Sequence, residues 1–272
     1  MTQVRCLVLS GYGLNCDHET AHACRLAGAD AERVHINALI NGSRRLDDYQ
    51  MVIFGGGFSW GDDHGAGVIQ ALRMKTHLGE GLQRFIAAGN LVFGICNGFQ
   101  TLVNLGLLPG FDGDYSQRLV ALTYNDSGNF RDQWVHLRIN EASPCVFTRG
   151  MGSIELPVRH GEGKFYAQPS VIEHLQAAGQ VVVQYADGQG RPASGCFPDN
   201  PNGSVADIAG ICDPTGRVFG LMPHPEAFNH PTNHPDWTRR AHDVEAAIGA
   251  FPREPVGGIG FFENAVSYLN HG

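Results

Sequence analysis

The chain has 272 residues, enough for one large domain or two small ones. Hydrophobic residues make up 43% and charged residues 17%, as in ordinary globular proteins. Acidic residues outnumber basic ones, 27 to 19, and no Lys/Arg-rich patch occurs. This charge pattern argues against nucleic acid as a partner. The seven cysteines are scattered and include no CxxC pair, so we expect free thiols. No signal peptide is evident, and no apolar run approaches the ~18 residues of a membrane helix, so we expect a soluble, cytoplasmic protein.

Up to residue 95, strand-like and helical patterns alternate along the chain. We expect strands at residues 4–9 and 51–54, another that starts at 34–36, and a fourth at 91–95. Between them, Asp17 is expected to cap a helix that ends near Ala27, and residues 68–88 form a helix with an interruption near Gly79 and Gly81. This alternation predicts an α/β fold with a mostly parallel central sheet and flanking helices.

The second half of the chain is richer in strands. Turn residues separate strand-like runs, with one helical pattern in the middle of this half and another near its end. The predicted strands are at 119–123, 134–139, 154–157, 181–185, 208–212 and 217–222, and the predicted helices at 171–178 and 261–269. We expect a single domain over residues 1–272 with these additional strands in its C-terminal half. Residues 229–259 are expected to form a surface extension, because prolines break the spacing of their histidines and make a metal site the weaker alternative.

The segment Gly-Ile-Cys-Asn-Gly at 94–98 lies between a predicted strand and a predicted helix. Glycine on either side of Cys96 removes the Cβ atoms that would clash in a sharp strand-to-helix turn. A thiol at a helix N-terminus experiences a field that favours the thiolate, which is the nucleophilic form. The pattern therefore predicts a nucleophile, and the alternative is a buried structural cysteine beside a tight turn.

A general base for that thiol is predicted far downstream, in Met-Pro-His-Pro-Glu at 222–226. The two prolines favour an extended backbone, which would place His224 and Glu226 on one side, two residues apart. Glu226 could then hold one ring nitrogen of His224 and leave the other for Cys96. The alternative is a surface histidine at the end of a strand.

The run Gly55-Gly56-Gly57 follows a predicted strand. Three glycines allow backbone N–H groups to turn toward a ligand, as an oxyanion hole requires. The alternative is a flexible loop at the strand exit.

Two other motifs are weaker. His18-Glu19-Thr20-Ala21-His22 matches the zinc pattern HExxH, but no third ligand motif follows, and a solvated helix face is the expected alternative. Gly11-x-Gly13 lacks the third glycine of a dinucleotide-binding loop, and no phosphate-binding Walker sequence occurs, so nothing indicates a nucleotide site.

Taken together, these motifs resemble the class I (triad) glutamine amidotransferases, and most closely the separate glutaminase subunits used in purine biosynthesis. The resemblance spans most of the chain up to residue 228, and it rests on the segments at 15–19 (NCDHE), 55–62 (GGGFSWGD), 94–100 (GICNGFQ), 160–165 (HGEGKF), 200–204 (NPNGS) and 222–226 (MPHPE). It implies a flavodoxin-like class I amidotransferase fold. The family's usual Arg-Ala-Gly run is replaced here by His64-Gly65-Ala66-Gly67, which puts communication with a partner in question.

The resemblance also implies roles for individual residues. Cys96, His224 and Glu226 would form the catalytic triad, and the oxyanion would be held near Gly56 and Gly57 and by the N–H of Asn97. Residues implied to bind the substrate glutamine are Gln100, Asn129 and Phe130. A further set either faces a partner or consists of ordinary loop polar groups: Asp62, His160, Glu162 and Lys164.

By the same resemblance, the chain would hydrolyse L-glutamine to glutamate and ammonia. A synthetase large subunit would bind ATP and Mg and use the ammonia to convert formylglycinamide ribonucleotide to formylglycinamidine ribonucleotide, with a possible third small subunit. The chain itself is expected to need no cofactor and no metal. Three alternatives remain at this point: another class I glutaminase, a cysteine peptidase or hydrolase of the same fold, and a binding subunit that has lost catalysis.

Overall fold

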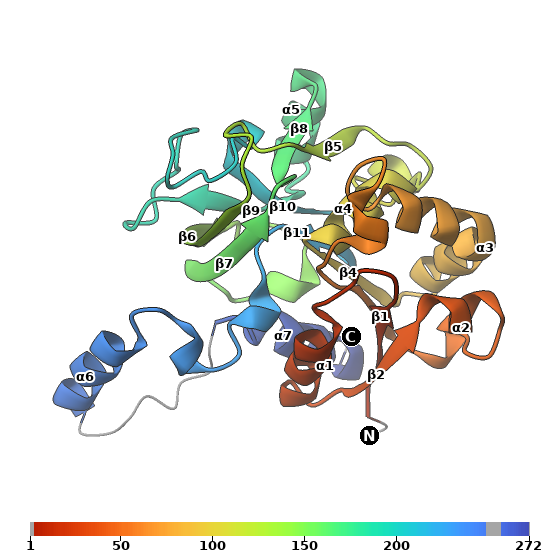
Figure 1. Ribbon diagram of the computed structural model, residues 1–272, viewed down its shortest axis with the longest axis horizontal. Coiled ribbons are helices and arrows are strands. Elements are labelled where there is room, and N and C mark those ends of the chain that lie inside the picture. The colour runs from red at the N-terminus through yellow and green to blue at the C-terminus, as the bar shows by residue number, and fades with distance from the viewer. Residues whose placement is uncertain (1–2, 249–256, 272) are drawn as a thin grey trace.

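The core of the molecule is a nine-stranded sheet, seen in Figure 1 with helices on both sides. The computed structural model describes residues 3–248 and 257–271. The strands follow the order β2-β1-β3-β4-β11-β10-β9-β6-β7 across the sheet. Their bounds are β1 Arg5–Ser10, β2 Asp30–His35, β3 Met51–Phe54, β4 Leu91–Ile95, β6 Arg131–Ile139, β7 Ile154–His160, β9 Val181–Ala186, β10 Ile208–Cys212 and β11 Val218–Leu221.

The sheet has a parallel and an antiparallel part. Strands β2, β1, β3, β4 and β11 pair in parallel, and β3 and β4 are buried along their whole length, as expected for strands covered on both faces. From β11 onward, β10, β9, β6 and β7 pair antiparallel. The α/β fold is therefore confirmed, and the additional strands predicted in the C-terminal half extend the same sheet.

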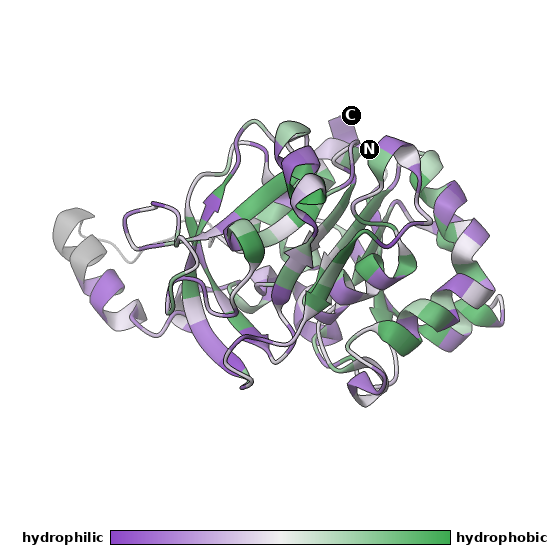
Figure 2. Cartoon of the chain, turned by 90° about the horizontal axis from the view of Figure 1, so that it is seen from above, coloured by the Kyte–Doolittle hydropathy of each residue, from purple (hydrophilic) through white to green (hydrophobic). Residues whose placement is uncertain are grey.

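Helices cover the two faces of the sheet. The crossovers β1-α1-β2 and β3-α3-β4 run in opposite directions across the sheet, and right-handed crossovers therefore place α1 and α3 on opposite faces. Helix α7 contacts α1, and α3 packs on α4; in Figure 2 the apolar strands lie between these layers. The helix bounds are α1 Asp17–Leu26, α2 Ile36–Ile40, α3 Val68–Ala87, α4 Asn97–Leu105, α5 Pro169–Ala177, α6 Trp237–Ile248 and α7 Gly260–His271.

Two features lie outside the main layers. Strands β5 (Val120–Thr123) and β8 (Lys164–Ala167) form a separate antiparallel pair near α5. Helix α6, within the predicted extension, stands away from the rest of the fold in Figure 1. Within residues 3–248 and 257–271, no helix is both long and apolar enough to span a membrane.

Several expected boundaries were wrong. The second strand was expected to start at residues 34–36, but it ends at His35. It ends there because the His35 side chain accepts a hydrogen bond from the Asn37 N–H (3.1 Å) and caps α2. Helix α3 is continuous through Gly79, since its amphipathic packing outweighs the local cost of glycine. Asp17 is the first residue of α1, with Cys16 as its N-cap, and strand β8 was missed.

Candidate active site

Cys96 lies at the junction between β4 and α4. Its backbone has φ 50° and ψ −106°, outside the regions that L-residues favour. Such a conformation costs about 1–3 kcal/mol and persists only where the surroundings impose it. The residue is buried, and its Sγ lies 3.7 Å from the carbonyl oxygen of Arg159 on β7. The predicted strand-to-helix turn at Cys96 is thus confirmed.

The two flanking glycines are required by close packing. A Cβ atom on Gly98 would lie 1.8 Å from the carbonyl oxygen of Phe54 in β3. One on Gly94 would lie 2.8 Å from the carbonyl oxygen of Gly98. Helix α4 therefore approaches the sheet so closely that only glycine fits at these positions, and this approach fixes where the Cys96 thiol points.

His224 and Glu226 follow β11, the strand beside β4. The Nδ1 atom of His224 lies 2.6 Å from Oε1 of Glu226, and both side chains are buried. The extended backbone predicted for this segment was wrong beyond His224: Pro225–Ala227 form a 3-10 turn, in which proline suits the first position. The turn still brings the carboxylate of Glu226 to the imidazole ring of His224.

The environment of His224 favours its protonated form. Burial alone lowers its pKa, but the Glu226 carboxylate, the Cys96 thiol and the Cys16 thiol together raise the pKa of His224 well above its usual value. The Nε2 atom of His224 has no hydrogen-bond partner within the described residues. With Glu226 on one nitrogen, the other is free to exchange a proton with a neighbouring sulfur or with a ligand.

The glycines predicted for the oxyanion hole lie against this histidine. A Cβ on Gly56 would be 2.7 Å from Cε1 of His224, and Gly57 has φ 142° and fits against the backbone of Gly13 to Asn15. Asn97 is the first residue of α4, so its N–H has no acceptor within the helix. These three positions border the junction that holds Cys96, and the loop is packed rather than loose.

A cavity of about 110 Å³ opens beside these groups. Its lining comes from five separate segments of the chain: Asn15, Cys16, Gly57, Phe58, Phe130, Arg159 and His224. Of the three residues implied to bind substrate, only Phe130 belongs to this lining. The Nε2 of Gln100 donates to the carbonyl oxygen of Glu162 (2.6 Å), and Asn129 is exposed, with Nδ2 on the carbonyl oxygen of Ser127 (3.1 Å).

Cys16 was not among the predicted site residues, yet its thiol lies beside His224. A Cβ on Gly56 would lie 3.1 Å from its Sγ. Burial raises the pKa of the Cys16 thiol. Ligand atoms of Cys16, His224 and Glu226 lie within 4.8 Å of one another, and Nδ1 of His224 is already hydrogen-bonded to Glu226. Two sequence signals pointed to it: the position of Cys16 at the start of α1, after a strand, and its place in the segment 15–19 that carries part of the family resemblance.

A buried network of hydrogen bonds around Asn202 lies next to the site. The Nδ2 of Asn202 donates to the carbonyl oxygen of Gly163 (2.9 Å) and lies 3.1 Å from the hydroxyl of Tyr185 and 3.5 Å from Nε2 of His160. Burial, and then the charge of His224, lower the pKa of His160 to about 3. His160 is thus neutral and internal, so it does not itself form part of an exposed partner surface.

The other residues considered for a partner surface lie nearby. Asp62 accepts a hydrogen bond from Nδ2 of Asn97 (3.0 Å), and burial together with Glu162 raises the pKa of Asp62 to about 6. Lys164 pairs with Asp126 (2.5 Å). The histidines of the HExxH motif, His18 and His22, lie exposed on α1, consistent with a solvated helix face.

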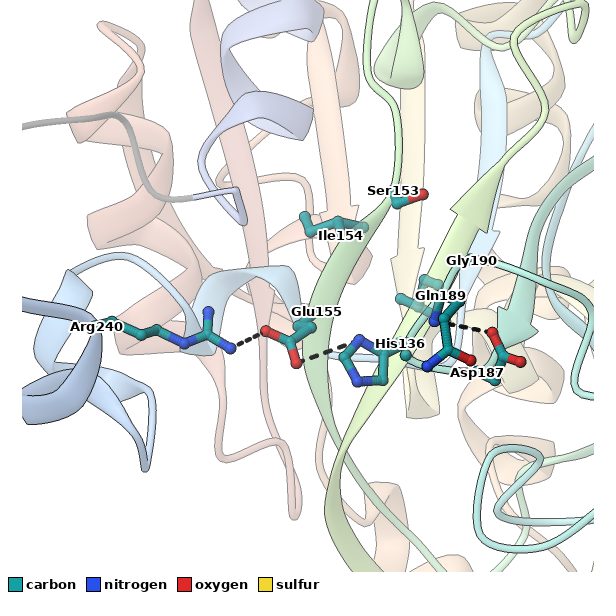
Figure 3. Close-up of a pocket in the computed structure, with 10 residues that line it drawn as sticks. His136, Ser153, Ile154, Glu155, Asp187, Gln189, Gly190 and Arg240 are labelled. Carbon is teal, nitrogen blue, oxygen red and sulfur yellow. Dashed lines mark hydrogen bonds and ion pairs between the residues drawn. The ribbon is translucent and has the colours of Figure 1, made fainter. Parts of the chain in front are cut away.

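A larger cavity, of about 570 Å³, lies elsewhere, between β6, β7 and the loop at 187–190 (Figure 3). Glu155 dominates it, pairing with His136 (3.2 Å), with His234 (3.4 Å) and with Arg240 of α6. Figure 3 shows Arg240, Glu155 and His136 in a row along one wall. It shares no lining residue with the cavity at His224, and its charges are already paired, so we place no chemistry there.

Known proteins resemble this chain along its whole length. Residues 3–269 match the family described as CobB/CobQ-like glutamine amidotransferase domain. A phosphoribosylformylglycinamidine synthase subunit PurQ from Methanococcus maripaludis is 44% identical over 264 residues, covering 97% of each chain. One from Dehalococcoides mccartyi is 44% identical over 268 residues, covering 98% of each.

Solved structures agree. The structure of PurLQS from Thermotoga maritima matches with a TM-score of 0.71 and 28% identity, over 98% of this chain and all of that one. A glutamine amidotransferase from the same organism matches with a TM-score of 0.55 and 14% identity, which supports the fold alone.

The α/β sheet and the Cys-His-Glu arrangement thus define a class I glutamine amidotransferase fold. The chain belongs to the CobB/CobQ-like glutamine amidotransferase family and, within it, to the PurQ subunits of phosphoribosylformylglycinamidine synthase.

Proposed function

We propose that this chain is a glutaminase that hydrolyses L-glutamine to glutamate and ammonia and passes the ammonia to a synthetase in purine biosynthesis. The observation that carries the proposal is the arrangement of Cys96 on a strained turn, next to a histidine that is held by a buried carboxylate. Whole-length relatives named as PurQ subunits support it. They also favour it over a peptidase of related fold, and the presence of all three triad side chains disfavours a binding subunit without catalysis.

In the proposed mechanism, the sulfur of Cys96 attacks the side-chain amide carbon of glutamine. The resulting oxyanion is stabilised by backbone N–H groups at Asn97 and around Gly56 and Gly57. The imidazolium of His224 donates its Nε2 proton to the leaving nitrogen, so ammonia departs and a γ-glutamyl thioester remains.

Deacylation uses the same groups. Neutral His224 then accepts a proton from water, whose oxygen attacks the thioester carbon, and the C–S bond breaks to give glutamate and the Cys96 thiolate. Glu226 orients the ring throughout and stabilises its positive charge.

The ammonia is used by a partner. A synthetase large subunit would bind ATP and Mg and convert formylglycinamide ribonucleotide to formylglycinamidine ribonucleotide, with a small third subunit completing the assembly. The solved PurLQS complex supports such partners. The exposed aromatic rings of Phe58 and Phe130, which line the cavity, offer apolar surface for docking. We further propose that residues 1–272 form one domain, with residues 229–259 as an extension on its surface.

The nucleophile is tested by Cys96→Ser. We expect loss of glutamine hydrolysis by at least about a thousandfold, because a hydroxyl is a far weaker nucleophile than a thiolate. An electrophilic glutamine analogue should modify Cys96 and none of the other six cysteines, as read by mass spectrometry of peptides. The matched control is the exposed Cys196→Ser, which should keep full activity. Modification mainly at Cys16 would contradict the assignment.

A further inference from the structure

One half-buried cation at the candidate site has no counterion among the described residues. Arg159 lies near the end of β7 and lines the 110 Å³ cavity together with Cys16, Phe130 and His224. Two atoms of its guanidinium, Nε and Nη2, are fully buried and make no hydrogen bond within the described residues. Unpaired buried guanidinium nitrogens are costly, since they have lost water without gaining an acceptor.

The neighbouring acids do not meet this need. Asp132 stands directly opposite Arg159 in the β6–β7 ladder, but no ion pair joins them, and the Asp132 side chain is exposed. Glu226 is engaged with His224. Arg159 forms no ion pair with any side chain that the structure describes, so none of these residues supplies its counterion.

The two unpaired guanidinium atoms of Arg159 indicate which chemical group would bind there. Nε and Nη2 form the side of a guanidinium that binds a carboxylate through two parallel hydrogen bonds. A ligand entering the cavity would therefore present a carboxylate there, once a small side-chain movement opens this edge.

The separation between Cys96 and the Arg159 guanidinium matches the length of a glutamine molecule. The backbone carbonyl of Arg159 accepts from Cys96 Sγ at 3.7 Å, so the arginine side chain starts beside the sulfur. Its guanidinium carbon lies five bonds from Cα, roughly 6 Å when extended, and in glutamine the amide carbon lies four bonds from the α-carboxyl carbon, roughly 5 Å. Glutamine can therefore place its amide at Cys96 and its α-carboxylate at Arg159.

We propose that Arg159 binds the α-carboxylate of glutamine and so selects a free amino acid over other amides. This inference rests on the proposed glutaminase function and adds to it a specificity-determining residue. It adds Arg159 to the residues proposed to bind the substrate and keeps Phe130 as an apolar wall of the same cavity.

The test uses the complete assembly with its synthetase partner and compares Arg159→Met with the wild type. The methionine retains bulk and removes the charge. We expect KM for glutamine to rise roughly tenfold to a hundredfold, the range for a charge-assisted pair, with kcat changed less than about threefold. Arg159→Lys should restore part of the loss. Arg73→Ala on the exposed side of α3 is the control and should leave KM unchanged.

A second substrate makes the test specific. 4-Aminobutyramide has the amide and amino group of glutamine but no α-carboxylate, so wild type and Arg159→Met should hydrolyse it with equal kcat/KM. An unchanged KM for glutamine, or an equal loss for both amides, would overturn the role of Arg159. If Arg159→Met does not fold, Arg159→Lys carries the same comparison. Cys96→Ser separates the two proposals, because hydrolysis surviving in that variant removes the proposed function itself.

Discussion

Single residues at the site differ in how far the sequence could predict them. Cys96, His224 and Glu226 stand within short motifs whose local geometry the chain encodes, and the structure brings them to adjacent strands. Arg159 stands in no such motif, and the segment at 15–19 that contains Cys16 gave that residue no role. Their place at the cavity depends on the β1–α1 loop meeting the end of β7, which is a tertiary contact between residues far apart in sequence. The sequence therefore predicted the proposed reacting groups but missed part of the cavity wall.

His160 provides a prediction at this scale. In the native protein the pKa of His160 is about 3, because of burial and the nearby charge of His224, whereas an unfolded histidine titrates near its ordinary value, roughly 6.5. Between these values the unfolded chain binds a proton that the native chain does not. Its contribution to stability is therefore complete above pH 6.5 and falls by about 1.4 kcal/mol per pH unit toward pH 3.

We expect His160→Gln to weaken this acid sensitivity, as measured by urea unfolding at several pH values from 4 to 7. His22→Gln, on the exposed side of α1, should keep the wild-type slope. His224 acts in the opposite sense: since its pKa is raised, its contribution is lost as pH increases, so the comparison is made below pH 7. A slope identical in wild type and His160→Gln would show that His160 is not held neutral.

Among whole elements, the contact between α4 and β3 most directly places the nucleophile. The sequence predicted the strand, the turn and the helix because each has its own periodicity and a glycine boundary. It did not predict where β2 ends, because the capping by His35 outweighs the strand propensity of Ile36, which begins α2. Nor did it predict that α3 continues through Gly79, which is decided by packing on α4 and by the long amphipathic pattern.

Gly98→Ala tests the α4–β3 contact. The added Cβ would lie 1.8 Å from the carbonyl oxygen of Phe54, so α4 must shift away from the sheet. We expect a loss of stability of about 2–4 kcal/mol, from overpacking, and a larger fractional loss of glutaminase activity as Cys96 moves.

Gly79→Ala in α3 is the matched control for that variant. A Cβ there would meet nothing within 4 Å, and alanine favours the helix, so we expect a gain of about 0.5–1 kcal/mol. Both variants are measured by urea unfolding, and Gly98→Ala with stability equal to wild type would show that the close approach is not required.

At the scale of the whole molecule, one segment connects the cavity to an exposed surface. Trp60, Asp62 and His64 all have positive φ values, a conformation that costs energy for residues other than glycine. The segment begins at Phe58, which lines the cavity, and reaches Asp62, which holds the side chain of Asn97. A partner that presses on this surface could therefore move both Gly57 and the N–H of Asn97.

This connection leads to a prediction about coupling. The chain contains the proposed groups for releasing ammonia, whereas the proposed use of ammonia lies on the partner, and unregulated hydrolysis would waste glutamine. We expect slow hydrolysis by the isolated chain and a rate increase of at least about tenfold when the synthetase, ATP and formylglycinamide ribonucleotide are added. Aligning a single oxyanion donor is worth about a hundredfold to a thousandfold in kcat, which is enough to account for such an increase.

The measurement is glutamate release by the chain alone and by the full assembly, with Cys96→Ser as the blank. Asp62→Ala should reduce the ratio of the two rates, because it removes the hydrogen bond that ties the strained segment to Asn97. The adjacent, exposed Asp63→Ala should keep the wild-type ratio. Equal rates with and without the partner would mean that the donors are already aligned in the free chain. A ratio unaffected by Asp62→Ala would instead show that the signal reaches Asn97 by another route, since the carboxylate of Asp62 is the link between that segment and the start of α4.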